Sequence, residues 1–141
     1  MTPGELLRSE AAKWLRQAAK DRNAAHALLE VEPSRSVFHS QQAAEKAVKA
    51  FLTFHQIAFR KTHDLTDLGA QCAAADPSLE AVMRQAQELT DYASAFRYPD
   101  APYEPDAAEA ALALAIASEL CQEVEKRMDT PGVRDLDGHH E

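Results

Sequence analysis

The residues best suited to chemistry lie around Arg97, at the predicted end of a helix. Arg97 continues the inward-facing stripe of that helix, and Tyr98 and Tyr103 follow it in a proline-rich segment. A guanidinium is always charged and donates several hydrogen bonds, so on an apolar stripe it needs an anionic ligand, a carboxylate or a subunit interface. Arg97 therefore either binds a ligand or pairs with a carboxylate such as Glu45 or Asp100. The two tyrosines either stack on a base or cover the end of the fold.

A second candidate site precedes a predicted helix that starts near residue 65. Arg60, Lys61 and His63 bring together three potential cations just before the free N–H groups of that helix. Such an arrangement attracts phosphate and would suit a nucleotide. The alternative is that His63 caps the helix and the cations are solvated.

Polar side chains also interrupt two apolar helix stripes. Gln41 lies inside the stripe of one predicted helix and Glu45 lies at its border, while Arg22 and His26 lie on the stripe of another, one turn apart. Buried amides and charges need partners. We therefore expect these four residues to line a groove of the fold or the seam of a dimer.

The elements that must position these residues are helices. Helical periodicity dominates the chain, no strand-like alternation persists, and there are only 4 glycines. We predict helices over about 5–29, 34–57, 65–75, 77–97 and 106–128. Their lengths and short connections predict an all-α fold, an up-and-down four-helix bundle with an extra short helix. The bundle is expected to span residues 1–130, and residues 131–141 are expected to form a disordered polar tail.

Local signals add detail to this plan. Ser34 is expected to cap the second helix, and Asp76 is expected to cap the fourth, with proline at its first position. Lys46 and Lys49 are expected to point away from the apolar stripe of the second helix. His55 is expected to lie on that stripe.

Composition limits the functions that the chain can have. It has 141 residues, with 15 Lys+Arg against 23 Asp+Glu and a net charge of −8, which argues against DNA binding through bulk charge but leaves a local basic site open. No signal peptide or membrane span is apparent, so a cytoplasmic location is expected. Cys72 and Cys121 are expected to be buried free thiols. No zinc-ligand spacing occurs, and we expect neither a metal nor a cofactor.

Three blocks of the sequence resemble the HEPN domain family in their order and spacing. They are residues 36–50, residues 62–65 (Thr-His-Asp-Leu) and residues 97–99 (Arg-Tyr-Pro). The resemblance extends from about residue 9 to residue 128. It implies a bundle of four to five helices that is usually dimeric, is often made beside a small nucleotidyltransferase partner, and is implicated in nucleotide binding or RNA cleavage.

The resemblance also implies where a ribonuclease of this family would place its catalytic pair. Ribonuclease toxins of the family carry an arginine followed by a histidine a few residues later, and Arg97 matches the arginine. No histidine occurs among the six residues that follow it. A phenol with a pKa of about 10 is a poor general base at neutral pH, so Tyr103 is no substitute. Arg22, following Asp21, is a second departure, because relatives tend to carry an apolar residue there.

These observations lead to a ranked set of functional hypotheses. The first is a homodimeric, non-catalytic or weakly catalytic HEPN protein that acts with a nucleotidyltransferase partner, in a toxin–antitoxin-like role, through nucleotide or RNA contacts at Arg97, Tyr98 and His63. The second is an RNA endonuclease toxin in which Arg97 works with His63 or His39 from either subunit. The third makes Tyr98 or Tyr103 the target of nucleotidylation by the partner.

Overall fold

The computed structural model describes residues 1–59, 61, 65–96, 98–101 and 103–128. These residues form five α-helices and one short 3-10 helix, and none of them lies in a strand. The elements are α1 (Pro3–Leu28), α2 (Pro33–Phe54), α3 (Leu65–Ala75), η1 (Pro77–Leu79), α4 (Glu80–Ser94) and α5 (Ala107–Met128). The predicted all-α bundle with an extra short helix is confirmed. The predicted polar tail, residues 131–141, lies outside the described residues.

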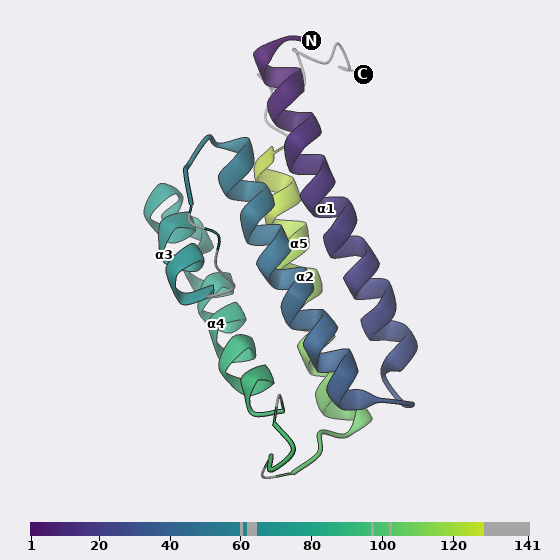
Figure 1. Cartoon of the computed structure of the whole chain (residues 1–141). Coiled ribbons are helices and arrows are strands. Elements are labelled where there is room, and N and C mark those ends of the chain that lie inside the picture. The colour runs from purple at the N-terminus through teal and green to yellow at the C-terminus, as the bar shows by residue number, and fades with distance from the viewer. Residues whose placement is uncertain (60, 62–64, 97, 102, 129–141) are drawn as a thin grey trace.

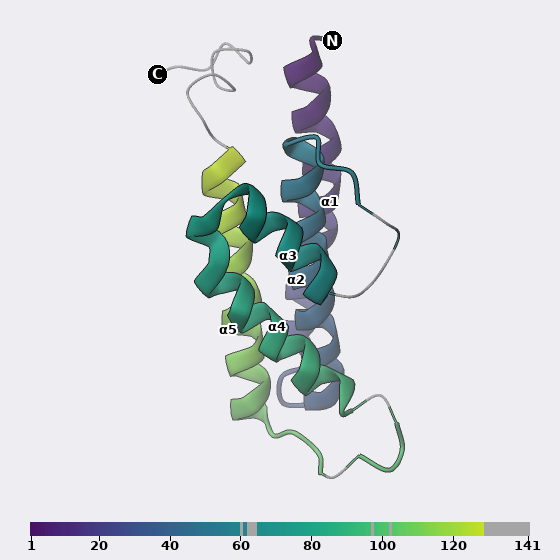
Figure 2. The ribbon, with the colours of Figure 1, turned by 90° about the vertical axis from the view of Figure 1, so that its left-hand side faces the viewer.

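Helix α2 lies at the centre of the bundle and contacts α1, α3, α4 and α5. Figure 1 shows α1 along one side of α2, with α3 and α4 along the other. Turned by 90°, Figure 2 shows α4 beside α5, with α3 on the same side of the bundle. Most residues of α2 are buried because it has neighbours on nearly every side. Any polar side chain on this helix must therefore find a partner or a ligand.

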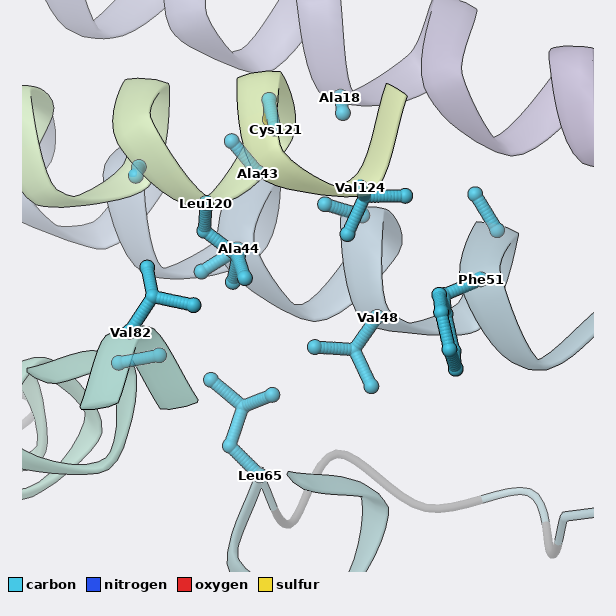
Figure 3. Close-up of a cluster of buried hydrophobic side chains, with 14 of the residues drawn as sticks. Ala18, Ala43, Ala44, Val48, Phe51, Leu65, Val82, Leu120, Cys121 and Val124 are labelled. Atoms are coloured by element: carbon cyan, nitrogen blue, oxygen red, sulfur yellow. The ribbon is translucent and has the colours of Figure 1, made fainter. Parts of the chain in front are cut away.

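The core forms where α2, α5 and α3 meet. Val48 and Phe51 of α2 pack with Leu120 and Val124 of α5 and with Leu65 of α3 (Figure 3). Each of these side chains is at most 2% exposed, and burying one contributes about 1.5–3 kcal/mol. Alanines at the helix contacts, which include Ala18, Ala44 and Ala117, are fully buried and let the backbones approach closely.

The helix starts follow capping chemistry, with two corrections. Thr2 and Glu5 form a reciprocal capping box at α1. Asp76 accepts a hydrogen bond from the backbone N–H of Ser78 (3.1 Å), but the helix that it caps is the 3-10 helix η1, whereas α4 begins at Glu80 with Leu79 as its N-cap. The prediction that Ser34 caps α2 is wrong. The helix begins one residue earlier, at Pro33, because proline is favoured at a first helical position, where no N–H is needed.

Two helix ends also differ from the prediction. Helix α2 ends at Phe54, before the predicted end at residue 57, and His55 is its exposed C-terminal cap. The ring of His55 packs on Phe51, with 4.4 Å between ring centres, and on Phe54, with 5.0 Å. The chain turns because Gln56 takes a left-handed φ of 58°, while the N–H of Ile57 donates to the carbonyl of Leu52 (2.8 Å). Helix α4 ends at Ser94, before the predicted end at residue 97.

The two cysteines lie where they were expected. Cys72 of α3 and Cys121 of α5 are buried and free, which confirms the prediction. Burial raises the pKa of Cys72 to about 12. Burial also raises the pKa of Cys121, to about 11, although the positive charge of Arg22 on α1 acts in the opposite direction.

Candidate functional site

A row of polar side chains runs along α2 below the surface. Gln41, Glu45 and Lys49 follow one another at helical spacing and are 3%, 1% and 7% exposed. The Lys49 ammonium donates to Glu45 Oε2 (2.9 Å) and lies 5.3 Å from the ring centre of Trp14 on α1. The prediction that Lys49 points away from the core is therefore wrong. The Trp14 ring of α1 and the Glu45 carboxylate stabilise its buried ammonium.

Gln41 is only partly satisfied within this row. Its Oε1 accepts a hydrogen bond from Nε2 of the neighbouring Gln42 (3.2 Å). Its own Nε2 is buried and has no hydrogen-bond partner in the described part of the chain. A buried donor without an acceptor costs about 1–3 kcal/mol, so this amide is a candidate for contact with a ligand.

Helices α1 and α2 are joined by a cluster of charged and polar groups around Asp21. Asp21 accepts from Lys46 Nζ through Oδ2 (2.6 Å) and hydrogen-bonds His39 Nδ1 through Oδ1 (2.9 Å). His39 and Lys46 lie two turns apart on the same face of α2, which is why one carboxylate reaches both. Lys46 also does not point away into solvent as predicted. The carboxylate holds the ring of His39 through its Nδ1.

A cleft of about 400 Å³ opens between the start of α2 and the end of α4. Its lining comprises Ser34, Arg35 and Phe38 from α2, and Ala93, Phe96, Tyr98 and Pro99 from α4 and the chain that follows it. Phe38 and Tyr98 are 39% and 64% exposed, unusually high for aromatic rings of a bundle. The cleft thus combines a guanidinium, a hydroxyl and accessible aromatic rings.

The wall of the cleft is held in place by other aromatic rings. Phe96 packs edge-to-face on Tyr92 (4.9 Å between ring centres) and on Tyr103 (5.4 Å). The Tyr103 hydroxyl donates to Glu109 at the start of α5 (3.3 Å). Burial, with Tyr103 and Glu109 nearby, raises the pKa of Tyr92 well above its usual value. Tyr103 therefore braces the wall from behind, whereas Tyr98 lines the cleft itself.

The start of α2 favours an anion at the mouth of this cleft. Glu32, at the N-cap, makes no side-chain capping bond, and the first turn contains no acidic residue. Free backbone N–H groups at a helix start carry partial positive charge. The guanidinium of Arg35 is exposed beside them.

The other predicted site residues do not converge on one place. Gln41 and Glu45 are buried on α2. Arg22 is half-buried on α1, with no partner for its Nε among the residues that the structure describes, and His26 is exposed near the end of α1. The groove or dimer seam predicted for these four stays a prediction. Of the basic segment, Lys61 is exposed. Arg60, His63 and Arg97 lie outside the described residues.

A family model described as HEPN domain matches residues 11–127. The chain belongs to the HEPN domain family. No curated protein and no solved structure matches the sequence. The polar row, the Asp21 cluster and the cleft all lie inside the matched part of this HEPN domain. No helix of the described residues is long and apolar enough to cross a membrane.

Several residues that line the cleft of this HEPN domain were not among the predicted site residues. Arg35 and Phe38 lie just before the recognisable Gln41–Ala50 stretch, and Phe96 lies directly before Arg97. Phe38 is out of step with the apolar stripe that contains Val37, Ala44 and Val48, and that offset was a signal that could have marked it.

Proposed function

We propose that this HEPN protein binds a nucleotide or a single-stranded RNA in the cleft between α2 and α4. The observation that carries the proposal is the presence of Arg35, Phe38 and Tyr98 on one cleft, with both rings accessible. Stacking of a base on an aromatic ring contributes about 1–3 kcal/mol, whichever base it is. The edge-to-face contacts of Phe96 keep the wall rigid, so little ordering is needed on binding.

The phosphate of the ligand is assigned to the start of α2. Arg35 supplies a charge-assisted hydrogen bond, and the uncapped N–H groups supply partial positive charge. Arg97 directly precedes Tyr98 in the chain and is proposed as a second phosphate contact, with His63 and the basic residues before it as further candidates. Local charge of this kind permits anion binding despite the net charge of −8.

Titration with ATP and with a short single-stranded RNA tests this proposal. Arg35→Ala and Phe38→Ala are each expected to weaken binding roughly tenfold or more, because they remove a charged contact and a stacking ring. Arg84→Ala is the matched control, since Arg84 is an exposed arginine of α4, outside the cleft, that pairs with Glu80 (3.7 Å). Absence of binding by the wild-type protein, or equal loss in the control, would contradict the proposal.

The protein is further proposed to act as a cytoplasmic homodimer with a nucleotidyltransferase partner, in a toxin–antitoxin-like role. The Nε of the half-buried Arg22 has no hydrogen-bond partner among the described residues, which supports a second subunit at that face of α1, because a buried donor without an acceptor is costly. Light scattering at micromolar concentration is expected to give twice the monomer mass. Co-purification with the product of a neighbouring nucleotidyltransferase gene would test the partner.

RNA cleavage is a second candidate function, and the Asp21–His39 contact favours it. A carboxylate on Nδ1 fixes the tautomer and orientation of an imidazole, which leaves Nε2 to take a proton. His39 also packs on Phe38, a residue of the cleft, with 5.4 Å between ring centres. If His39 is the base, His39→Gln abolishes cleavage of cellular RNA. RNA that stays intact when the wild-type chain is expressed alone argues against this function.

Nucleotidylation by the partner, if it occurs, is assigned to Tyr98. Its ring is 64% exposed, whereas the Tyr103 hydroxyl already donates to Glu109. The Tyr98 oxygen would attack the α-phosphorus of ATP, lose its proton and release pyrophosphate. Intact mass after incubation with the partner and ATP, compared between wild type and Tyr98→Phe, decides this point.

A further inference from the structure

A groove of about 250 Å³ runs between α4 and α5. Figure 2 shows the two helices side by side. Leu89 of α4 and Leu112 and Ile116 of α5 are among the side chains that line the groove, and Leu112 is 68% exposed. The groove shares no lining residue with the cleft between α2 and α4, so a role for one does not depend on a role for the other.

The size and shape of the groove suit a helix better than a small molecule. Small-molecule sites usually enclose about 300–1,000 Å³, which is more than this groove offers. Its lining on α5 extends over residues 109–116, about two turns. A furrow between two packed helices accepts side chains from successive turns of a third helix.

Negative charge flanks the groove. Residues 85–94 of α4 and 107–122 of α5 contain no Lys or Arg. Glu88 and Glu109 belong to the lining itself. Glu109 is held in place, because its Oε1 accepts from the backbone N–H of Asp106 at the start of α5 (3.0 Å). An occupant that complements this groove therefore carries positive charge beside its apolar side chains.

The same charge disfavours a second copy of this chain as the occupant. A symmetric dimer through the groove would bring Glu88 and Glu109 of both copies into one interface, where like charges repel. Helix α1 has exposed cations, which include Lys13 and Arg16. Among the described residues of α1, however, Leu6 is the exposed large hydrophobic side chain, so this helix offers no apolar row to fill the groove.

We propose that the groove between α4 and α5 binds a basic amphipathic helix of a different protein. Apolar side chains of that helix, one turn apart, contact Leu112 and Ile116, and its Lys or Arg residues reach Glu88 and Glu109. The apolar contacts supply affinity, while the charges orient the helix and speed its association. The net charge of −8 assists the approach of a basic partner.

Fluorescence anisotropy with two synthetic peptides tests the inference. Each peptide has about 18 residues, or five helical turns, with leucine along one face. The first carries lysine and alanine on its other faces, and the second carries glutamate in place of every lysine. The wild-type protein should bind the lysine peptide at micromolar concentration, more weakly at high salt, and should not bind the glutamate peptide.

Three variants show whether the peptide lies in the groove. Leu112→Gln should weaken binding of the lysine peptide roughly tenfold, because it removes the exposed leucine, and an exposed substitution of this kind should not affect folding. Glu88→Gln should weaken it roughly threefold. Glu125→Gln is the control, since Glu125 is an exposed acid 13 residues after Leu112, on the opposite side of α5, and it should bind as the wild type does.

The result that would overturn the inference takes several forms. They are no binding of the lysine peptide, equal affinity for the two peptides, and equal affinity of Leu112→Gln and Glu125→Gln. Light scattering tests the other occupant. If the wild type is a dimer and Leu112→Gln is a monomer, the groove holds a second copy of the chain and the inference is wrong, whereas an unchanged mass agrees with it.

Discussion

Asp21 of α1 and Lys46 of α2 form a hydrogen-bonded ion pair with 2.6 Å between Oδ2 and Nζ. The two residues are 25 positions apart in the chain, and the pair joins the helices that make the most extensive contact in the bundle. Asp21 is 9% exposed, so its charge is largely removed from water and depends on its partners. The pair therefore has both a structural and a positioning role, because the same carboxylate holds His39.

Replacing Asp21 should destabilise the protein clearly. Asp21→Ala leaves Lys46 and His39 without the carboxylate that they share, and we expect a loss of about 2 kcal/mol in the free energy of unfolding. Urea denaturation measures this loss. Lys13→Ala removes an exposed ion pair with Glu10 on the same helix and should change the stability by less than about 0.5 kcal/mol. Equal effects of the two substitutions would show that Asp21 has no special role.

Replacing Lys49, the buried lysine of α2, should destabilise the protein more than replacing Asp21. Lys49→Ala removes the ammonium that donates to Glu45 and lies over Trp14, and it leaves a carboxylate that is 1% exposed without this charge. We expect a loss of about 3 kcal/mol, again by urea denaturation. The double variant Lys49→Met with Glu45→Gln should recover part of that loss. If Lys49→Ala is neutral, the ammonium does not stabilise the folded state.

The end of α2 offers a substitution that should stabilise the protein. Gln56 has a φ of 58° at the position after the cap where glycine is preferred, and it pays the steric cost of the left-handed region. Gln56→Gly should raise the free energy of unfolding by about 0.5–1 kcal/mol. The same change at Gln42, inside α2, should lower it by about 1 kcal/mol. A loss of stability in Gln56→Gly would contradict the left-handed geometry.

The buried thiols should be inert in the folded protein. Because burial raises the pKa of Cys72 to about 12 and that of Cys121 to about 11, almost no thiolate exists at pH 8. Alkylation with iodoacetamide should therefore be slow until a denaturant is added. Rapid reaction of the folded protein would show that the thiols are accessible.

These raised pKa values also predict how stability depends on pH. The unfolded chain ionises its thiols near pH 9 while the folded chain keeps them protonated, so this contribution is complete below pH 9 and is lost as pH rises toward 11 and 12. Cys72→Ala should lose stability less steeply with pH over that range. If the free energy of unfolding falls equally steeply with pH in the variant and in the wild type, the burial of this thiol is contradicted.

Much of the fold follows from local patterns, as α2 shows. The stretch Gln41–Ala50 is recognisable as a helix with polar groups on an inward face, and Gln41 and Glu45 are indeed buried. Caps and prolines placed most helix ends within a few residues. The left-handed turn at Gln56 could not be foreseen, because a glycine usually marks such a position.

The candidate site depends on contacts between helices, which local patterns do not contain. A lysine is normally solvated, so Lys46 and Lys49 were expected to lie outside the core. In the folded protein, Asp21 of α1 pairs with Lys46, and the Trp14 ring of α1 lies beside the Lys49 ammonium. The cleft has the same origin, because Phe38 of α2 and Tyr98 line one cleft only when α4 is packed on α2. The side-chain periodicity of one helix does not tell which face of another it meets.

The binding of a nucleotide in the cleft between α2 and α4 is the central claim, and amide chemical-shift mapping tests it most directly. A 15.5 kDa chain is well suited to this measurement during titration with ATP. We predict that the largest shifts occur at Ser34, Arg35, Phe38, Phe96 and Tyr98, and that they disappear in Phe38→Ala. Shifts confined to other faces of the bundle, or no shifts at millimolar ATP, would contradict the claim.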